Sequence, residues 1–90
     1  MTYVFKASET FWRNFYALPE GQKQSTRKAW LVFKNDPFDP RLNVHRIARL
    51  SALARRTIHS ATVEYDLRVL FYIERDTVFT VDIGNHAVYK

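Results

Sequence analysis

The strongest constraint on the fold of this chain is an alternation of apolar and polar residues in its last third. Between Leu67 and Glu74, every odd-numbered residue is apolar, and the even-numbered residues include arginine, tyrosine and glutamate. A period of two is typical of a β-strand, because successive side chains point to opposite faces of a sheet. A second such run follows the polar break at 74–76, so two adjacent strands are predicted. The apolar face is expected to continue on the second strand through Phe79, Val81 and Ile83.

The first half of the chain is predicted to form a short strand followed by two helices. The strand is expected over 2–6, and Ser8 is a favourable N-cap for the helix that follows. Apolar residues then recur at helical spacing in both helices. The second helix is expected to end near Asn35, since the residues before Pro37 and Pro40 disfavour helical geometry. The predicted buried positions are Phe11, Phe15, Leu18, Thr26, Ala29, Trp30 and Phe33.

Size and composition limit the classes of protein that this chain can belong to. Ninety residues provide one small domain, predicted to span 1–90, and a hydrophobic content of 47% allows a packed core. No apolar run approaches the roughly 18–20 residues that cross a bilayer. No charged segment followed by an apolar one opens the chain, so a cytoplasmic location is expected.

Cysteine content and charge narrow the chemistry further. The chain has no cysteine, which excludes disulfides, thiolate catalysis and cysteine-ligated zinc, and its three histidines lack a metal-ligand spacing. No metal or other cofactor is therefore expected. The net charge of +5 and the pI of about 9.8 favour a polyanionic partner such as a nucleic acid.

Two short segments carry a resemblance to a known family. They are 65–71, with the sequence YDLRVLF, and 82–86, with the sequence DIGNH, and Tyr89 follows near the end. In a basic chain of this length, their order and spacing resemble the RelE/ParE superfamily of bacterial toxins, whose RelE-like members cut messenger RNA in the ribosomal A site. The resemblance covers the whole chain. It implies an α+β fold in which two N-terminal helices pack on a mainly antiparallel sheet of about four strands.

The resemblance also implies partners and leaves alternatives. A RelE-like toxin has a cognate antitoxin protein, with which it forms a hetero-oligomer, and acts on the ribosome and mRNA. One alternative is a ParE-like inhibitor of DNA gyrase, a branch that generally lacks the pair equivalent to His86 and Tyr89. Another alternative is a non-catalytic scaffold of the same fold, which Ala87 and Thr62 keep open, because relatives often carry aspartate and arginine at these places.

The segment from Leu42 to Arg56 allows two interpretations. Ile47, Leu50 and Ala54 recur at helical spacing, which allows a short helix. The resemblance instead implies a brief extended segment followed by a loop. We expect the loop for 51–56.

Metal-free cleavage of RNA by its own 2′-hydroxyl needs a base, an acid and positive charge on the crowded phosphate. The resemblance assigns Arg68 to the catalytic site, where a guanidinium can bind phosphate through two parallel donors. The alternative is a cross-strand ion pair of Arg68 with Asp82 or Glu64. His86 and Tyr89 are the expected proton-transfer residues, against the alternatives of a loop histidine and an aromatic that packs the C-terminus.

Other residues near these positions have weaker claims. The resemblance places an aspartate after the catalytic histidine, whereas this chain has Ala87, either a natural variant or a substitution that weakens the toxin. His45 is an accessory acid–base candidate or an exposed loop histidine. His59 is expected to pack in the core, because many relatives have tryptophan there.

A basic cluster is predicted around the site. Its residues are expected to contact RNA, or alternatively to form a solvated loop: Arg46, Arg49, Arg55, Arg56 and Lys90. RNA bases stack on exposed aromatic side chains, and Tyr72 and Tyr89 are the candidates for this role.

Overall fold

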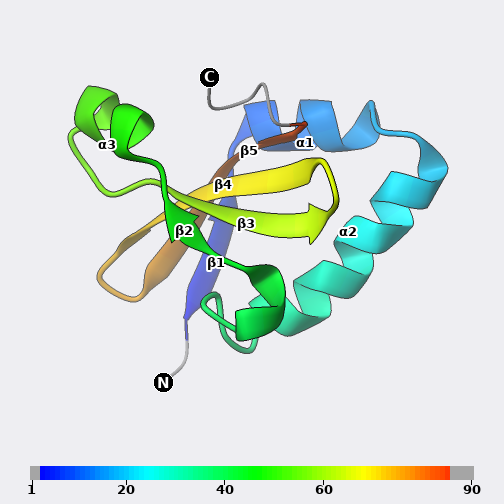
Figure 1. Cartoon of the computed structure of the whole chain (residues 1–90), viewed down its shortest axis with the longest axis horizontal. Coiled ribbons are helices and arrows are strands. Elements are labelled where there is room, and N and C mark those ends of the chain that lie inside the picture. Colours follow the sequence, from blue (N-terminus) through cyan, green and yellow to red (C-terminus); the bar gives the residue numbers. More distant parts are fainter. Residues whose placement is uncertain (1–2, 86–90) are drawn as a thin grey trace.

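The computed structural model describes residues 3–85 and shows a five-stranded sheet with helices on both faces (Figure 1). The α+β class is confirmed, with one more strand and one more helix than expected in the described residues. The elements in chain order are β1 Val4–Ala7, α1 Glu9–Tyr16, α2 Glu20–Phe33, a 3-10 turn Pro40–Leu42, β2 His45–Arg46, α3 Ala48–Ala54, β3 His59–Glu64, β4 Leu67–Glu74 and β5 Thr77–Gly84.

The sheet order is β1-β5-β4-β3-β2. β1 runs parallel to β5, with Val4 opposite Thr77, and the other neighbouring strands are antiparallel. After β1, the helices α1 and α2 lead to β2 at the opposite edge of the sheet, and the antiparallel strands β3, β4 and β5 then bring the chain back beside β1. β2 has only two residues, too few for a period of two to be visible in the sequence.

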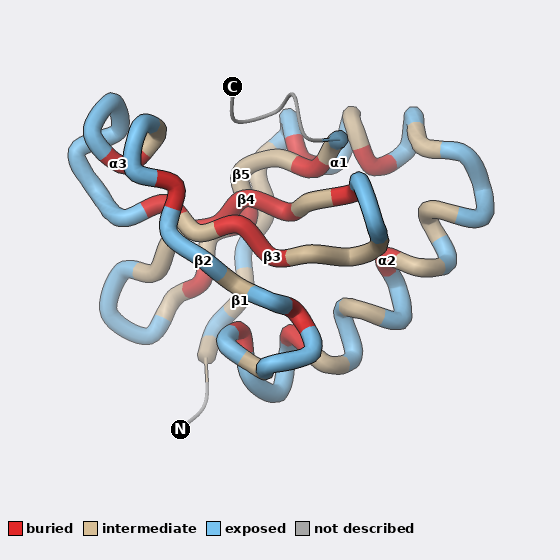
Figure 2. The backbone as a smooth tube through the Cα atoms, viewed as in Figure 1, coloured by how far each residue is buried: buried red, intermediate tan, exposed pale blue. Residues whose placement is uncertain are grey.

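The two N-terminal helices cover one face of the sheet, which we call the α1–α2 face. The Ser8 hydroxyl accepts a hydrogen bond from the Phe11 amide at 3.0 Å, which confirms the expected N-cap of α1. Phe11 and Phe15 pack on Leu67, Val69 and Ile83, and Phe33 of α2 packs on Phe71 in a second cluster. Figure 2 shows buried stretches along the central strands β3 and β4. No helix in the described residues is long and apolar enough to cross a membrane.

The opposite face, which we call the α3 face, is more covered than expected. The prediction of a loop over 51–56 was wrong for 51–54, which belong to α3, and only Arg55 and Arg56 lie outside the helix. This helix begins after Ile47 without a side-chain cap, so the capping signal that marks α1 is absent here. Ile47 and Ile58 pack against Leu70 of β4, and this contact holds the α3 segment on the sheet.

The expected apolar face of β5 was wrong for two of its three residues. Ile83 lies on the α1–α2 face, but Phe79 stacks on Tyr72 and Val81 packs beside Leu70, both on the α3 face. The cause is a β-bulge. Leu70 pairs with Asp82 and Phe71 pairs with Thr80, so β5 contains one extra residue, Val81, between these two pairs. The residue that fills the α1–α2 face instead is Val78, which is fully buried.

Candidate functional site

Arg68 lies on the α3 face of β4, next to Thr62 of β3. Cross-strand partners share a face, and neighbouring strands are about 4.8 Å apart. On the next row of the same face, Leu70 lies opposite Ser60, which in turn pairs with His45 of β2. The register therefore brings Arg68 and His45, two of the predicted catalytic residues, onto one face of the sheet, two strands apart.

The hydrogen bonds of Arg68 differ from both interpretations of the sequence. Its Nη1 donates to the carbonyl oxygens of Glu64 at 3.1 Å and of Tyr65 at 2.9 Å, which ties the side chain to the β3–β4 turn. The ion pairs of the described residues do not include Arg68. The expected alternative, an ion pair with Asp82 or Glu64, is thus not formed in residues 3–85.

Both of those carboxylates turn toward the helices. Asp82 accepts a hydrogen bond from the Asn14 side chain of α1 at 2.6 Å. Glu64 accepts one from the Gln22 side chain of α2 at 3.4 Å. The positive charge of Arg68 is therefore left without a neutralising partner among these neighbours, as a phosphate-binding residue requires.

Three polar side-chain atoms within residues 3–85 are buried without a hydrogen-bond partner: Ser60 Oγ, Thr62 Oγ1 and Arg68 Nε. All three belong to the α3 face and lie on adjacent strands. A buried polar group with no partner costs about 1–3 kcal/mol. We call this group of residues the Arg68 site.

Two β-bulges flank the Arg68 site. The register between β3 and β4 shifts between Thr62 and Glu64, and the register between β4 and β5 shifts after Leu70. Bulges change the direction of side chains and are common next to active sites. Here the extra residues are Val63 of β3 and Val81 of β5, so the two strands beside the Arg68 segment of β4 both bend close to it.

His45 and Arg46 occupy the short edge strand β2, and both are exposed. The Nδ1 atom of His45 lies 3.4 Å from the carbonyl oxygen of Asn43. Arg46 pairs with His59, so it points to the α1–α2 face, away from the Arg68 site. The structure thus places His45, and not Arg46, on the same face as Arg68.

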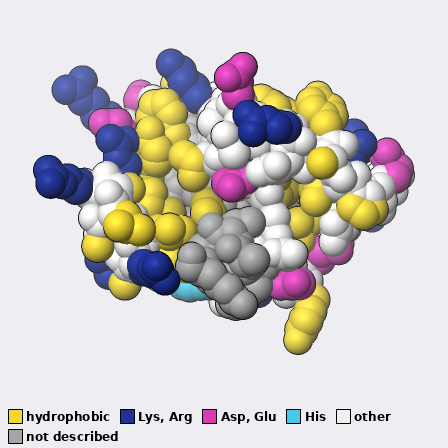
Figure 3. Space-filling view, turned by 90° about the horizontal axis from the view of Figure 1, so that it is seen from above, with side chains coloured by type: hydrophobic (Ala, Val, Ile, Leu, Met, Phe, Trp, Pro, Cys, Tyr) yellow, Lys and Arg dark blue, Asp and Glu magenta, His cyan; other side chains and the backbone are white. Residues whose placement is uncertain are grey.

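Three other arginines of the predicted basic cluster surround α3. Arg49 and Arg55 are exposed, and Arg56 lies over the Tyr72 ring at 4.3 Å and forms an ion pair with Glu74 at 3.5 Å. Figure 3 shows Lys and Arg side chains projecting from the end of the molecule where Figure 1 places α3. Tyr72 is less available for base stacking than expected, because Arg56 lies over its ring and Phe79 stacks on it with a centroid distance of 4.9 Å.

Several sequence predictions fall outside the described residues. These are His86, Ala87, Tyr89 and Lys90. Their assignments remain predictions from the sequence.

His59 packs among aromatic side chains on the α1–α2 face. Its ring lies 5.1 Å from that of Phe71 and 5.2 Å from that of Phe38. Burial lowers the pKa of His59, because the apolar surroundings disfavour the charged form. The expected packing role of His59 agrees with these contacts.

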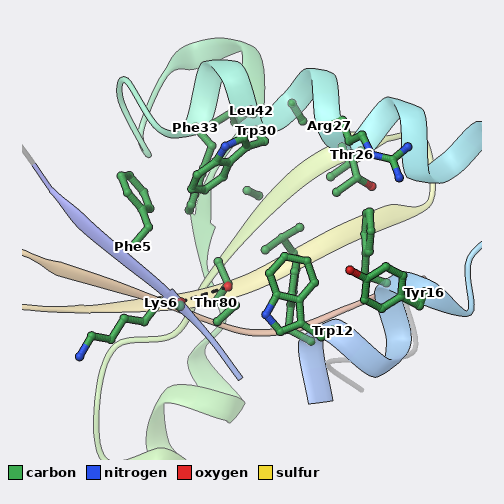
Figure 4. A pocket seen from close by; sticks show the side chains of 17 residues that line it. Phe5, Lys6, Trp12, Tyr16, Thr26, Arg27, Trp30, Phe33, Leu42 and Thr80 are labelled. Atoms are coloured by element: carbon green, nitrogen blue, oxygen red, sulfur yellow. Dashed lines mark hydrogen bonds between the residues drawn. The ribbon is translucent and has the colours of Figure 1, made fainter. Parts of the chain in front are cut away.

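A second surface, which sequence reasoning missed, is a groove between α1 and α2, with a volume of about 490 Å³. Figure 4 shows Trp12 and Tyr16 of α1 on one side and Trp30 of α2 on the other. These three residues are 46%, 64% and 40% exposed, respectively. The expectation that Trp30 is buried was therefore wrong, because the two helices diverge over the sheet. Two aromatic residues on the outer side of a short helix, at positions 12 and 16, were the available signal.

The charged residues that line the groove are both cationic, Lys6 and Arg27. Arg27 lies over the Phe15 ring at 5.6 Å and pairs with Glu20 at 3.4 Å. The groove is thus an apolar surface with positive charge at its walls. Elsewhere in residues 3–85, no three histidine, aspartate or glutamate side chains come close enough together to hold a metal ion.

Comparison with known proteins finds similarity in the fold and not in the sequence. No protein-family model and no curated protein sequence matches the chain. Among solved structures, the archaeal RelE–RelB complex from Pyrococcus horikoshii OT3 matches with a TM-score of 0.72 and 13% identity over 94% of this chain and 96% of that one. The E. coli DinJ–YafQ toxin–antitoxin complex matches with a TM-score of 0.72 and 13% identity over 98% and 97%.

A metal-bound toxin from Helicobacter pylori matches with a TM-score of 0.69 and 17% identity over 100% of both chains. At such identities a structural likeness shows the fold and leaves the chemistry to be argued from the site. The chain has the fold of RelE-like toxins over nearly all of its length.

Proposed function

We propose that this protein is the toxin of a type II toxin–antitoxin pair and cleaves mRNA in the ribosomal A site. The observation that carries the proposal is Arg68, which lies on the α3 face of a RelE-like sheet with a buried Nε–H and takes part in none of the ion pairs within residues 3–85. The net charge of +5 and the arginines around α3 favour an RNA partner.

The proposed chemistry uses only groups of the protein and the RNA. The 2′-hydroxyl of one nucleotide loses its proton and attacks the adjacent phosphorus, and the bond to the 5′-oxygen of the next nucleotide breaks when that oxygen gains a proton. His86 and Tyr89 are proposed to share these proton transfers, with His45 as an accessory acid–base group. Arg68 is proposed to stabilise the charge that grows on the phosphate oxygens.

We further propose that the groove between α1 and α2 holds part of a cognate antitoxin. An exposed aromatic surface of this kind marks a protein interface. Its cationic walls, Lys6 and Arg27, suit an amphipathic segment with acidic side chains. Two of the solved structures of this fold are toxin–antitoxin complexes, which supports such a partner.

The groove offers a direct test of the partner. Both tryptophans of the chain, Trp12 and Trp30, line it, so tryptophan fluorescence reports on its occupation. Binding of a small acidic protein encoded next to this gene should shift the emission to shorter wavelength, and Tyr16→Ala should weaken binding. Tyr65→Ala is the matched control, because Tyr65 is 95% exposed at the β3–β4 turn. Binding without a change in emission would place the partner elsewhere.

Toeprinting of a translated mRNA in the presence of the purified protein tests the enzymatic activity. Discrete cuts in the A site are expected. Inhibition of DNA gyrase without such cuts would instead support the ParE-like alternative. Absence of both activities would leave the non-catalytic scaffold, and mRNA cut equally with and without ribosomes would contradict the ribosome-dependent mechanism.

A further inference from the structure

The Arg68 site contains more hydrogen-bonding capacity than the described residues use. Ser60 is 0% exposed, and its hydroxyl has no partner within residues 3–85. Thr62 Oγ1 and Arg68 Nε are also buried and have no hydrogen-bond partner within residues 3–85, although the two residues as a whole are half-buried. The three groups lie on one face, with Thr62 directly opposite Arg68 and Ser60 two residues along the same strand.

Packing alone does not explain the two hydroxyls. Alanine has nearly the volume of serine, and valine nearly that of threonine, so both replacements would fill the same space without an unpaired polar atom. A buried hydroxyl without a partner destabilises the protein. Two buried threonines show the contrast: Thr80 donates to the Lys6 carbonyl oxygen at 3.2 Å, and Thr26 donates to the Gln22 carbonyl oxygen at 2.8 Å.

The chemistry of the site favours an anion. A guanidinium N–H can only donate, and each hydroxyl can donate, so all three groups can point hydrogens at one set of oxygen atoms. Arg68 supplies a positive charge, and the neighbouring carboxylates of Asp82 and Glu64 accept hydrogen bonds from Asn14 of α1 and Gln22 of α2. A cluster of hydrogen-bond donors beside a cation matches the non-bridging oxygens of a phosphodiester.

We infer that Thr62 and Ser60 bind the phosphate of the RNA together with Arg68 Nε. This inference rests on the proposed nuclease function and adds two residues to its site. The phosphate reaches Thr62 and Arg68 first, because these two residues are half-buried. Ser60 lies deepest and receives an oxygen last. The unmet hydrogen bonds of the free protein are then satisfied only in the complex.

The inference predicts opposite effects on binding and on stability. Thr62→Val removes the unpaired hydroxyl and keeps the shape, so the thermal midpoint should rise by about 4 °C. The same variant should bind a phosphodiester about tenfold more weakly, because one hydrogen bond to a charged group is lost. Thr62→Ser keeps the hydroxyl and should bind as the wild type does. Thr80→Val, whose hydroxyl is paired, should lower the midpoint and leave binding unchanged.

The probe is a 2′-O-methyl RNA trinucleotide, which cannot be cleaved by 2′-attack. Its binding is followed through the Arg68 Nε–H resonance in ¹⁵N-labelled full-length protein. A shift of this resonance, with weakened binding in Thr62→Val, supports the inference. An unchanged resonance, or binding by Thr62→Val equal to that of the wild type, would overturn it. A lower thermal midpoint of Thr62→Val would also overturn it, because the hydroxyl would then stabilise the folded protein.

The outcomes separate this inference from the proposed function. Equal A-site cleavage and equal trinucleotide binding by Thr62→Val and wild type would remove Thr62 from the site and keep the nuclease. Trinucleotide binding at Arg68 without any cleavage on ribosomes would keep the phosphate site and remove the nuclease. Ser60→Ala should repeat the Thr62→Val pattern with a smaller loss of binding, since its hydroxyl is the most deeply buried of the three.

Discussion

Replacing Arg68 with alanine should separate its two roles in the molecule. The structure gives Arg68 a local structural function, because Nη1 donates to two carbonyl oxygens of the β3–β4 turn at 3.1 and 2.9 Å. Hydrogen bonds from a charged donor contribute about 1.5–3 kcal/mol each when shielded from water. Tyr65 is 95% exposed, so water can replace the donor at its carbonyl. The substitution also removes the buried Nε–H that has no partner, which is itself destabilising. The net decrease in the free energy of unfolding should be about 1–2 kcal/mol.

The functional loss should be much larger than this destabilisation implies. If Arg68 stabilises the phosphate in the transition state, single-turnover cleavage on programmed ribosomes should fall by about 100-fold or more. Urea unfolding measures the first quantity, and toeprinting over time measures the second. Arg68→Lys is the informative companion, because it keeps the charge and loses the fork of donors. Arg13→Ala, an equal change of charge at an exposed position on α1, is the control.

Two results would refute this reasoning. Cleavage by a folded Arg68→Ala protein at the wild-type rate would show that Arg68 serves the turn alone. A loss of more than about 4 kcal/mol, with cleavage lost in proportion to the unfolded fraction, would make it a structural residue first and foremost.

The remaining predictions concern the core, α3, a histidine and the C-terminal segment. Phe71→Ala should destabilise by about 3–5 kcal/mol in urea unfolding, because Phe71 is 0% exposed, and a loss under 1 kcal/mol would contradict the described core. Ser51→Ala should cost about 1–3 kcal/mol, since the Ser51 hydroxyl accepts from the buried Ile58 amide at 2.8 Å; unchanged stability would show that α3 is held by packing alone. Burial holds the pKa of His59 below its ordinary value, so stability should be complete above about pH 6.5 and decline as pH falls below it, and His59→Phe should flatten that slope. Ala87→Asp should raise cleavage on programmed ribosomes if a carboxylate orients His86, and equal rates would show that His86 needs no such partner.

The parts of the fold that depend on local chemistry could be predicted from the sequence. The Ser8 cap and the alternation along β4 each depend on residues that are close together in the sequence, and both predictions agree with the structure. The bulge in β5 could not be predicted, because it depends on how two strands align and not on the residues of one strand. A short helix was one of two interpretations of 42–56, and the loop was preferred to it. α3 has seven residues and no side-chain cap, and tertiary contacts of Ile47 and the Ser51 hydroxyl hold it in place.

The candidate site was predictable in its residue types and less so in its contacts. Arginine at position 68 on one face of a strand follows from a period of two. Its acceptors are backbone carbonyl oxygens, which every residue has, so no sequence pattern could identify them. Arg46 was grouped with the RNA-binding arginines by its place in the chain, whereas the pairing of β2 turns it to the other face. The groove was missed because its width is set by the divergence of two helices, which is a property of their packing on the sheet.

The two proposed binding surfaces lie on opposite faces of the sheet, and this arrangement limits how the proposed antitoxin can block the proposed nuclease. The groove opens on the α1–α2 face, whereas Arg68 and its unpaired neighbours lie on the α3 face. A helix held only in the groove would leave the Arg68 site uncovered. Neutralisation by direct occlusion therefore needs a partner long enough to cross an edge of the sheet, and the edges are β1 and the two-residue strand β2. Truncating the antitoxin to its groove-binding segment should then preserve tight binding and restore cleavage, because affinity and inhibition come from different faces of the molecule.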